Sequence, residues 1–238
     1  WPREARENLI SLIGAGSAMV QIFEALDQEE IIFHWIPDWK AVRSLPQRNV
    51  LHRHTVDRHM VETAVQAAAL TRQVHRPDIL LFSALFHDIG KGTEEDHSER
   101  GVRLIEPLAK RIGFDGEDVE TIKLLVKHHL LLSATATRRD LDDPATIASV
   151  VDVIPNLQLL ELLHALSIAD GEATGRAAWT DWKASLVAEL VKRVELAITD
   201  NTVALQPELT VDQREKAESG VLAVSIEDRE SVYAIEIV

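Results

Sequence analysis

The chain has 238 residues and a formal net charge of −14, from 25 Lys and Arg against 39 Asp and Glu. Hydrophobic residues make up 46% of the sequence and charged residues 27%, which is typical of a folded globular protein and excludes a largely disordered chain. The absence of cysteine excludes disulfides, iron–sulfur clusters, cysteine-ligated zinc and thiol nucleophiles. Any metal must therefore be held by histidine and carboxylate side chains.

The charge balance argues against nucleic acid as a partner, because such binding depends on Lys and Arg that neutralise phosphates. The longest apolar run, residues 79–86, is far shorter than the roughly 20 residues that a membrane span needs. We therefore expect a cytoplasmic protein with neither a nucleic-acid nor a membrane partner. The chain has no initiating Met and ends inside an alternating apolar run, which predicts a piece of a longer protein.

Apolar residues recur with a helical period along most of the chain. Residues 9–26 predict one or two helices that break near Gly14 and Gly16. Thr55 is the expected N-cap of a helix that runs to about Val74.

The next two predicted helices flank a polar loop. The first begins at Asp78, directly after a proline, and is ended by Gly90 and Gly92. Ser98 is expected to open the second helix. Pro107 lies inside this second pattern and predicts a kink or a split.

Four more helical patterns are expected before about residue 199. Asp115 is a candidate N-cap, and Asp143 followed by Pro144 is a strong helix start. Leucine dominates residues 156–170, and Thr180 begins the last helical pattern. Up to this point the chain is predicted to be all-α.

The pattern changes near the C-terminus. Residues 210–219 predict a short polar helix, and residues 221–226 and 232–238 predict the two strands of a β-hairpin. An isolated hairpin is marginally stable in water. We therefore predict a mainly α helical bundle with a short C-terminal β-hairpin that begins a further β-containing domain.

Histidine and aspartate residues at the predicted helices form the most informative pattern. Side chains from several helices can converge in a bundle core to bind a metal. Asp170 and His129 are in phase with apolar stripes, and a carboxylate in an apolar core is costly unless it is paired or coordinated. A divalent cation bound by Asp170 and His129 would offset the cost of placing both side chains in an apolar core. The series comprises His59, His87, Asp88, His97, His129 and Asp170.

Each of these residues also has a structural interpretation. A single inward histidine is more often a hydrogen-bonded core residue than a ligand, and Asp170 could instead cap the loop that begins at Gly171. His128 is predicted to be a surface residue. The remaining histidines are placed outside the site, with His54 the strongest exception because it lies near His59 in the sequence. They are His34, His52, His54, His75 and His164.

The order His…His-Asp…Asp, with FHDIGK at 86–91, resembles the HD superfamily of metal-dependent phosphohydrolases, and the additional histidines resemble its two-metal members. A closer similarity is to the HD region of the bifunctional uridylyltransferase/uridylyl-removing enzymes that modify the PII nitrogen-signalling protein. It rests on HTVDRH at 54–59, LFHDIGKG at 85–92, DHSERG at 96–101, HLLLSATATRRDLDDPATI at 129–147, LSIADGEATG at 166–175 and WTDWK at 179–183.

In that family a nucleotidyltransferase domain precedes the HD domain, and two ACT domains that sense glutamine follow it. No Asp-x-Asp follows Gly16-Ser17 on a strand, so the transferase half is expected to be absent and only removal activity is implied. The implied organisation is a helical extension, the HD domain, a linker helix and the truncated first strands of an ACT-like domain. These parts span residues 1–48, 49–199, 200–220 and 221–238.

The resemblance implies that His59, His87, Asp88 and Asp170 hold one ion, and that His97 and His129 hold a second ion with Asp88 bridging. Manganese, iron or zinc suits these ligands, and magnesium remains open. Asp88, Lys91 and His97 are the implied catalytic residues, and Arg138 and Arg139 the substrate-binding residues. Lys91 could equally be a solvated loop lysine, and the two arginines a charged loop. Trp179 and Trp182 are predicted to be packing residues.

The implied activity removes UMP, or AMP in adenylylating relatives, from a tyrosine of the PII protein. Two alternatives stay open from the sequence. One is an HD phosphohydrolase that acts on a free nucleotide or a cyclic dinucleotide. The other is a non-catalytic helical scaffold that keeps a vestigial site.

Overall fold

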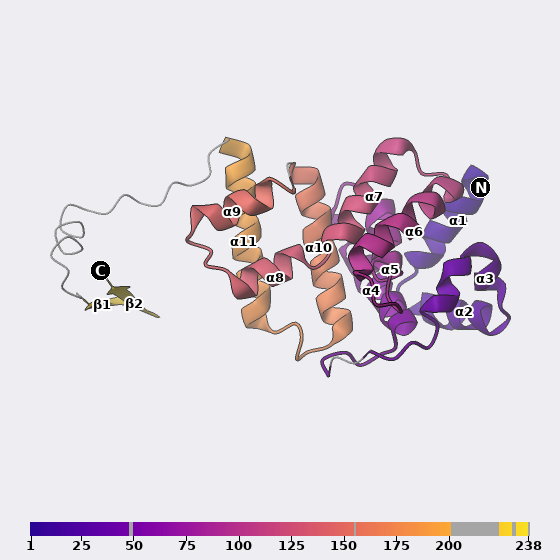
Figure 1. The fold of residues 1–238 in the computed structure, drawn as a ribbon, viewed down its shortest axis with the longest axis horizontal. Helices are drawn as coiled ribbons and strands as arrows, with labels where there is room; N and C mark the ends of the chain where they lie inside the picture. The colour runs from indigo at the N-terminus through magenta and orange to yellow at the C-terminus, as the bar shows by residue number, and fades with distance from the viewer. Residues whose placement is uncertain (48–49, 155, 201–223, 230–231, 238) are drawn as a thin grey trace. The chain divides into compact units, whose positions relative to one another are not determined.

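The computed structural model describes residues 1–47, 50–154, 156–200, 224–229 and 232–237. The chain divides into two compact units, Trp1–Val203 and Ala204–Val238. The first unit is helical throughout its regular structure, which confirms the mainly α prediction (Figure 1). Its elements are α1 (Arg3–Ile13), α2 (Ser17–Gln28), α3 (Ile31–Trp35), the 3₁₀ helix η1 (Pro37–Ala41), α4 (Val56–Leu70), the 3₁₀ helix η2 (Thr71–Gln73), α5 (Pro77–Phe86), α6 (His97–Ile112), α7 (Gly116–His128), α8 (Leu131–Arg138), α9 (Pro144–Val151), α10 (Leu157–Thr174) and α11 (Asp181–Asp200).

Helix α5 forms the centre of the helical unit. Every residue from Ile79 to Phe86 is buried, and the helix packs against α1, α4, α7 and α10. A helix that is apolar on all sides must be covered on all sides, which explains the continuous apolar run in the sequence. Helix α4 in turn packs against α10, so α4, α5 and α10 form the frame from which the site is built.

Helix α6 begins one residue earlier than its predicted cap. Asp96, not Ser98, is the N-cap, and its carboxylate accepts hydrogen bonds from the backbone N–H groups of Ser98 and Glu99. Pro107 does not split the helix. Pro107 lies on the exposed side of the helix, while buried neighbours such as Ile105 hold the helix to the core.

The predicted caps at Asp115 and Asp143 are confirmed, because each side chain accepts a hydrogen bond from the first turn of its helix. Helix α10 runs past Asp170 to Thr174, so Asp170 lies inside a helix and does not cap a loop at Gly171. The last helix, α11, begins directly after Thr180, whose hydroxyl accepts a hydrogen bond from the Lys183 N–H at 3.3 Å.

Helices α1 and α2 are separated at Gly14–Gly16, where Gly16 has a φ of 62°. In the described part of the chain, no single helix combines the length and apolarity of a membrane span. Only α1 and α2 taken together pass that test, as a pair bent by 118°.

The second unit contains two described strands, β1 (Val224–Arg229) and β2 (Val232–Ile237). They pair antiparallel, in the register that places Val224 opposite Ile237. The outer ends of the two predicted strands, residues 221–223 and 238, lie outside the described residues. The predicted polar helix at 210–219 lies outside the described residues, as does nearly all of the predicted linker at 200–220.

Candidate metal centre

The six predicted ligands come from five helices that meet at one end of α5. His59 lies on α4 and Asp170 on α10, while His87 and Asp88 directly follow α5. The other two lie at helix ends: His97 is the first residue of α6, and His129 directly follows α7. The structure therefore brings together residues that are up to 111 positions apart, from 170 − 59.

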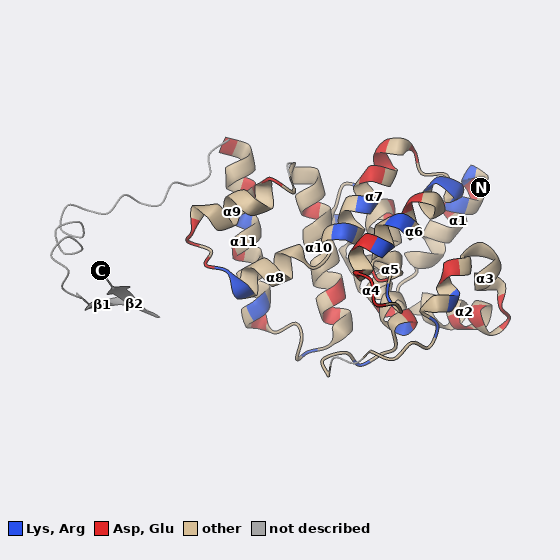
Figure 2. Ribbon diagram, in the orientation of Figure 1, with Lys and Arg blue, Asp and Glu red and all other residues tan. Residues whose placement is uncertain are grey.

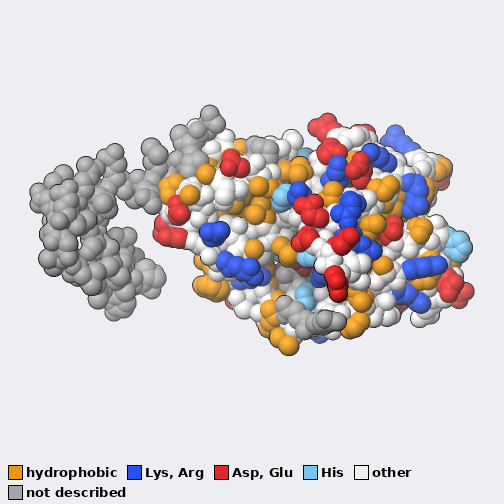
Figure 3. Space-filling model, in the orientation of Figure 1, with side chains coloured by type: hydrophobic (Ala, Val, Ile, Leu, Met, Phe, Trp, Pro, Cys, Tyr) orange, Lys and Arg blue, Asp and Glu red, His pale blue; other side chains and the backbone are white. Residues whose placement is uncertain are grey.

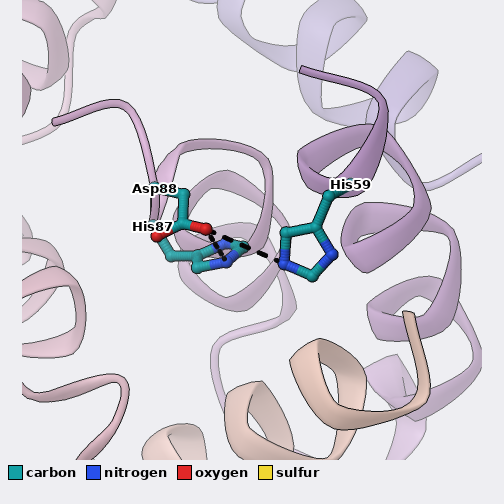
Figure 4. A group of neighbouring side chains, drawn as sticks. All are labelled: His59, His87 and Asp88. Carbon is teal, nitrogen blue, oxygen red and sulfur yellow. Dashed lines mark ion pairs between the residues drawn. The ribbon is translucent and has the colours of Figure 1, made fainter. Parts of the chain in front are cut away.

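His59, His87 and Asp88 form one buried group (Figure 4). His59 points from α4 toward the end of α5, and Asp88 Oδ2 lies 3.8 Å from its Nε2 and 3.4 Å from His87 Nε2. Asp170 Oδ1 completes this group at 2.9 Å from His59 Nε2 and 3.7 Å from His87 Nε2.

Asp88, His97 and His129 form a second group around the other carboxylate oxygen. Asp88 Oδ1 lies 3.7 Å from His97 Nε2 and 3.6 Å from His129 Nε2. Asp88 thus has one oxygen directed to each group, which is the arrangement that a bridging carboxylate requires.

Backbone carbonyls set the tautomers of two of these histidines. His87 Nδ1 lies 2.9 Å from the Ala84 carbonyl oxygen, and His129 Nδ1 lies 2.7 Å from that of Val126. A carbonyl only accepts, so each Nδ1 carries a proton and Nε2 is the ring nitrogen that remains to bind a metal. Metal-bound histidines are oriented by the same kind of second hydrogen bond.

Several buried polar atoms of the cluster have no hydrogen-bond partner among the described residues. They are His59 Nδ1, His87 Nε2 and Asp88 Oδ1. Leaving such an atom unsatisfied costs about 1–3 kcal/mol. Imidazole nitrogens and carboxylate oxygens suit a divalent transition metal, so the donor set fits a bound cation that would satisfy these atoms.

The electrostatics favour the ligand protonation states of Asp88, Asp170 and His129. Burial lowers the pKa of His87, but Asp88 and Asp170 outweigh it and raise that pKa. Burial alone would raise the pKa of Asp88, but His87, Lys91 and His129 outweigh it and hold that pKa well below its usual range. Burial likewise opposes ionisation of Asp170, yet His59 and His87 lower its pKa. Burial lowers the pKa of His129 to about 4, so its imidazole is neutral near pH 7.

Lys91 belongs to the cluster and is not a solvated loop lysine. Its Nζ lies 2.6 Å from Asp88 Oδ2 and donates a hydrogen bond to Gln47 Oε1 at 2.7 Å. Only 23% of its side chain is exposed. A cation is therefore present at the carboxylate that both groups share.

A close backbone contact fixes His97 beside Asp88. A Cβ at Gly90 would lie 2.0 Å from the His97 carbonyl oxygen and 2.5 Å from the Gly101 nitrogen. Gly90 therefore allows the loop after α5 to touch α6, which a larger residue would prevent. Arg100 reinforces this contact by donating hydrogen bonds to the carbonyls of Gly90 and Lys91 at 3.0 and 2.9 Å.

The cluster opens into a cavity of about 430 Å³. Asp88, His97, His129 and Asp170 form part of its wall, and Lys91 lines it as well. Of the two arginines predicted to bind substrate, Arg138 lines this cavity and Arg139 does not.

Sequence reasoning missed His52. Its ring lies 5.3 Å from the ring of His59 and lines the cavity, and its Nδ1 is buried without a hydrogen-bond partner in the described structure. The sequence favoured His54, which is closer to His59 in number. Both precede α4 in irregular backbone, where no helical phase indicates which side chain points inward. Thr174 and Lys183 also line the cavity and were missed.

Residues 56–157 match the family model for the HD domain. This part of the chain is an HD domain. The resemblance inferred from the His-Asp pattern is thus confirmed, and HD domains bind divalent metals.

The chain is also similar to proteins named bifunctional uridylyltransferase/uridylyl-removing enzyme. That of Streptomyces coelicolor is 57% identical over 194 residues, covering 82% of this chain and 23% of the relative. That of Mycobacterium tuberculosis is 50% identical over 204 residues, covering 85% and 25%. That of Gluconobacter oxydans is 35% identical over 215 residues, covering 84% and 23%. The chain spans about a quarter of the length of these relatives.

Proposed function

We propose that this HD domain is a metal-dependent phosphodiesterase that removes UMP, or AMP, from a tyrosine of the PII signalling protein. The observation that carries the proposal is the pair of ligand groups that share Asp88 at the wall of one cavity. The names of the similar proteins supply the substrate class, since each includes uridylyl removal.

In this proposal His59, His87, Asp88 and Asp170 hold one divalent ion. Asp88, His97 and His129 hold a second ion, and manganese, iron, zinc and magnesium are the candidates. Bound there, divalent ions activate water and offset the charge that develops on phosphoryl oxygens.

The protein's own residues orient and neutralise the substrate. Lys91, already paired with Asp88, adds a positive charge where a phosphoryl oxygen would bind. His97 and Asp88 are the other two catalytic residues, and both lie beside the position of that phosphoryl oxygen. Arg138 on the cavity wall binds the substrate, and Arg139, the next residue in the sequence, is the second proposed substrate-binding residue. A tyrosine phenolate leaving group has a pKa of about 10, so it needs less protonation than an alkoxide and no strong general acid is required.

The proposal extends to the organisation of the chain. Residues 1–48 form a helical extension, 49–199 the HD domain, 200–220 a linker helix and 221–238 the first strands of an ACT-like domain. In this proposal glutamine would act through ACT domains. The expected location is the cytoplasm, with neither nucleic acid nor membrane as a partner.

The test is release of UMP from uridylylated PII by the manganese-loaded chain, followed by mass spectrometry of the PII protein. Asp88→Asn should abolish release while helicity by circular dichroism is unchanged. Asp152→Asn is the matched control, because Asp152 is exposed and outside the cavity. Full activity of Asp88→Asn, or faster turnover of free or cyclic nucleotides than of modified PII, contradicts the proposal.

A further inference from the structure

Helix α10 and the loop that precedes α11 meet in a tight contact next to the metal centre. A Cβ at Gly171 would lie 2.2 Å from Trp179 Cε3 and 2.5 Å from Trp179 Cδ2. Only a glycine lets the indole ring lie directly against α10. Glycine inside a helix costs about 1 kcal/mol relative to alanine. Gly171 directly follows Asp170, so the glycine that lowers helix stability lies one residue from a predicted metal ligand.

The ammonium group of Lys183 lies over the face of the Trp179 ring. The Lys183 Nζ lies 5.5 Å from the ring centroid, within the range of a cation–π interaction. Lys183 makes no ion pair with any described residue. The tryptophan thus positions an ammonium group without neutralising it, unlike Lys91, whose charge is paired with Asp88.

Lys183 lines the same cavity as Asp88 and Asp170. Helix α8, which ends at Arg138, packs against α11 and also contributes to the wall of this cavity. Figure 2 shows basic residues at the end of α8 and at the start of α11, and Figure 3 shows Lys and Arg side chains grouped over this area. Arg138 likewise has no ion pair within the described ranges. In a chain of net charge −14, this cavity has two uncompensated cations on its wall.

We propose that Lys183, positioned by Trp179, is an anion-binding residue for a phosphoryl oxygen of the substrate and of the released nucleoside monophosphate. The inference rests on the proposed function for the identity of the ligand, and it deepens that function by adding a binding residue. A nucleoside monophosphate is close to a dianion near pH 7, and Lys183 with Arg138 supplies two positive charges. Lys183 contacts substrate in this account, whereas Trp179 and Gly171 act through Lys183 as positioning residues.

The experiment measures equilibrium binding of UMP to the manganese-loaded chain by isothermal titration calorimetry, with uridine as the probe that lacks phosphate. A charge-assisted hydrogen bond corresponds to roughly tenfold in affinity or more. Lys183→Gln should therefore weaken UMP binding roughly tenfold and flatten its dependence on salt, while uridine binding is unchanged. Lys183→Arg should bind UMP within about twofold of the wild type because the charge remains.

Three further variants separate the position of Lys183 from its charge. Lys192→Gln is the matched control, because it removes the same charge from an exposed site on α11 outside the cavity, and it should leave UMP binding unchanged. Trp179→Leu should weaken UMP binding, and Trp179→Phe should restore most of it because an aromatic face remains. UMP affinity of Lys183→Gln within twofold of the wild type, or an equal loss for uridine, overturns the inference.

The binding assay also separates this inference from the proposed function. If the wild type fails to release UMP from uridylylated PII but still binds UMP in a Lys183-dependent way, the proposed function fails and the anion site stands. If release is normal and Lys183→Gln leaves the KM and UMP affinity unchanged, only the anion site fails.

Discussion

Gly90→Ala is predicted to destabilise the protein and weaken metal binding together. The new Cβ would lie 2.0 Å from the His97 carbonyl oxygen, and an ordinary contact begins at 3.4 Å. The loop after α5 and the first turn of α6 must then separate by about 3.4 − 2.0 = 1.4 Å. Both obstructing atoms belong to backbone, so no flexible side chain can yield.

Overpacking of this kind costs about 1–3 kcal/mol, and we expect about 3 kcal/mol because two backbone atoms obstruct. The separation would also carry His97 away from Asp88, which it now faces at 3.7 Å. Disturbing the residues that orient ligands typically costs roughly 10–100-fold in metal affinity. The second ion should therefore be lost at lower chelator concentration than the first.

Urea denaturation of the metal-free chain measures the stability change, and chelator competition measures manganese affinity. Gly116→Ala is the matched control, because a Cβ at Gly116 meets nothing within 4 Å. It should be neutral or slightly stabilising. If Gly90→Ala unfolds within about 0.5 kcal/mol of the wild type and binds both ions normally, the close contact does not position His97 and the reasoning is refuted.

Three further predictions concern the core and the ligands. Arg76→Met leaves the buried Asp118 carboxylate without the guanidinium that now donates to both its oxygens, and should cost about 2–3 kcal/mol by urea denaturation. Burial opposes ionisation of Asp78, but Arg76 outweighs it and lowers the pKa of Asp78, so its stabilisation is present above about pH 4 and lost at lower pH. The stability difference between the wild type and Asp78→Asn should therefore shrink on acidification, and a constant difference contradicts this. His129→Gln should lose one bound metal ion by elemental mass spectrometry, whereas Asp88→Asn should lose both.

The helix caps could be predicted from the sequence because their hydrogen bonds are local. The candidate ligands could be predicted because they occur in a recognisable order along the chain. Asp115 and Asp143 cap their helices through hydrogen bonds that span only two or three residues. The inward phase of His129 on a predicted helix correctly indicates burial. For Asp170 the inward phase agrees with its place beside His59, whereas the alternative of a cap for a loop at Gly171 is wrong because helix α10 continues to Thr174.

The remaining features depend on contacts between distant segments. His52 approaches His59 from irregular backbone, so no period predicts its direction. Gly90 reads as a helix terminator, but its function is the contact with α6. In the sequence, Lys183 is one of several charged residues on a predicted amphipathic helix. Its position at the cavity depends on the packing of Trp179 against α10, which the sequence does not predict.

The number of metal ions per chain tests the central claim most directly. The measurement is elemental mass spectrometry of protein purified without chelator, saturated with manganese and freed of excess metal. Two groups of ligands that share Asp88 predict about two ions per chain. A value near zero would contradict the metal centre, and the buried unpartnered atoms of His59, His87 and Asp88 would then require another explanation.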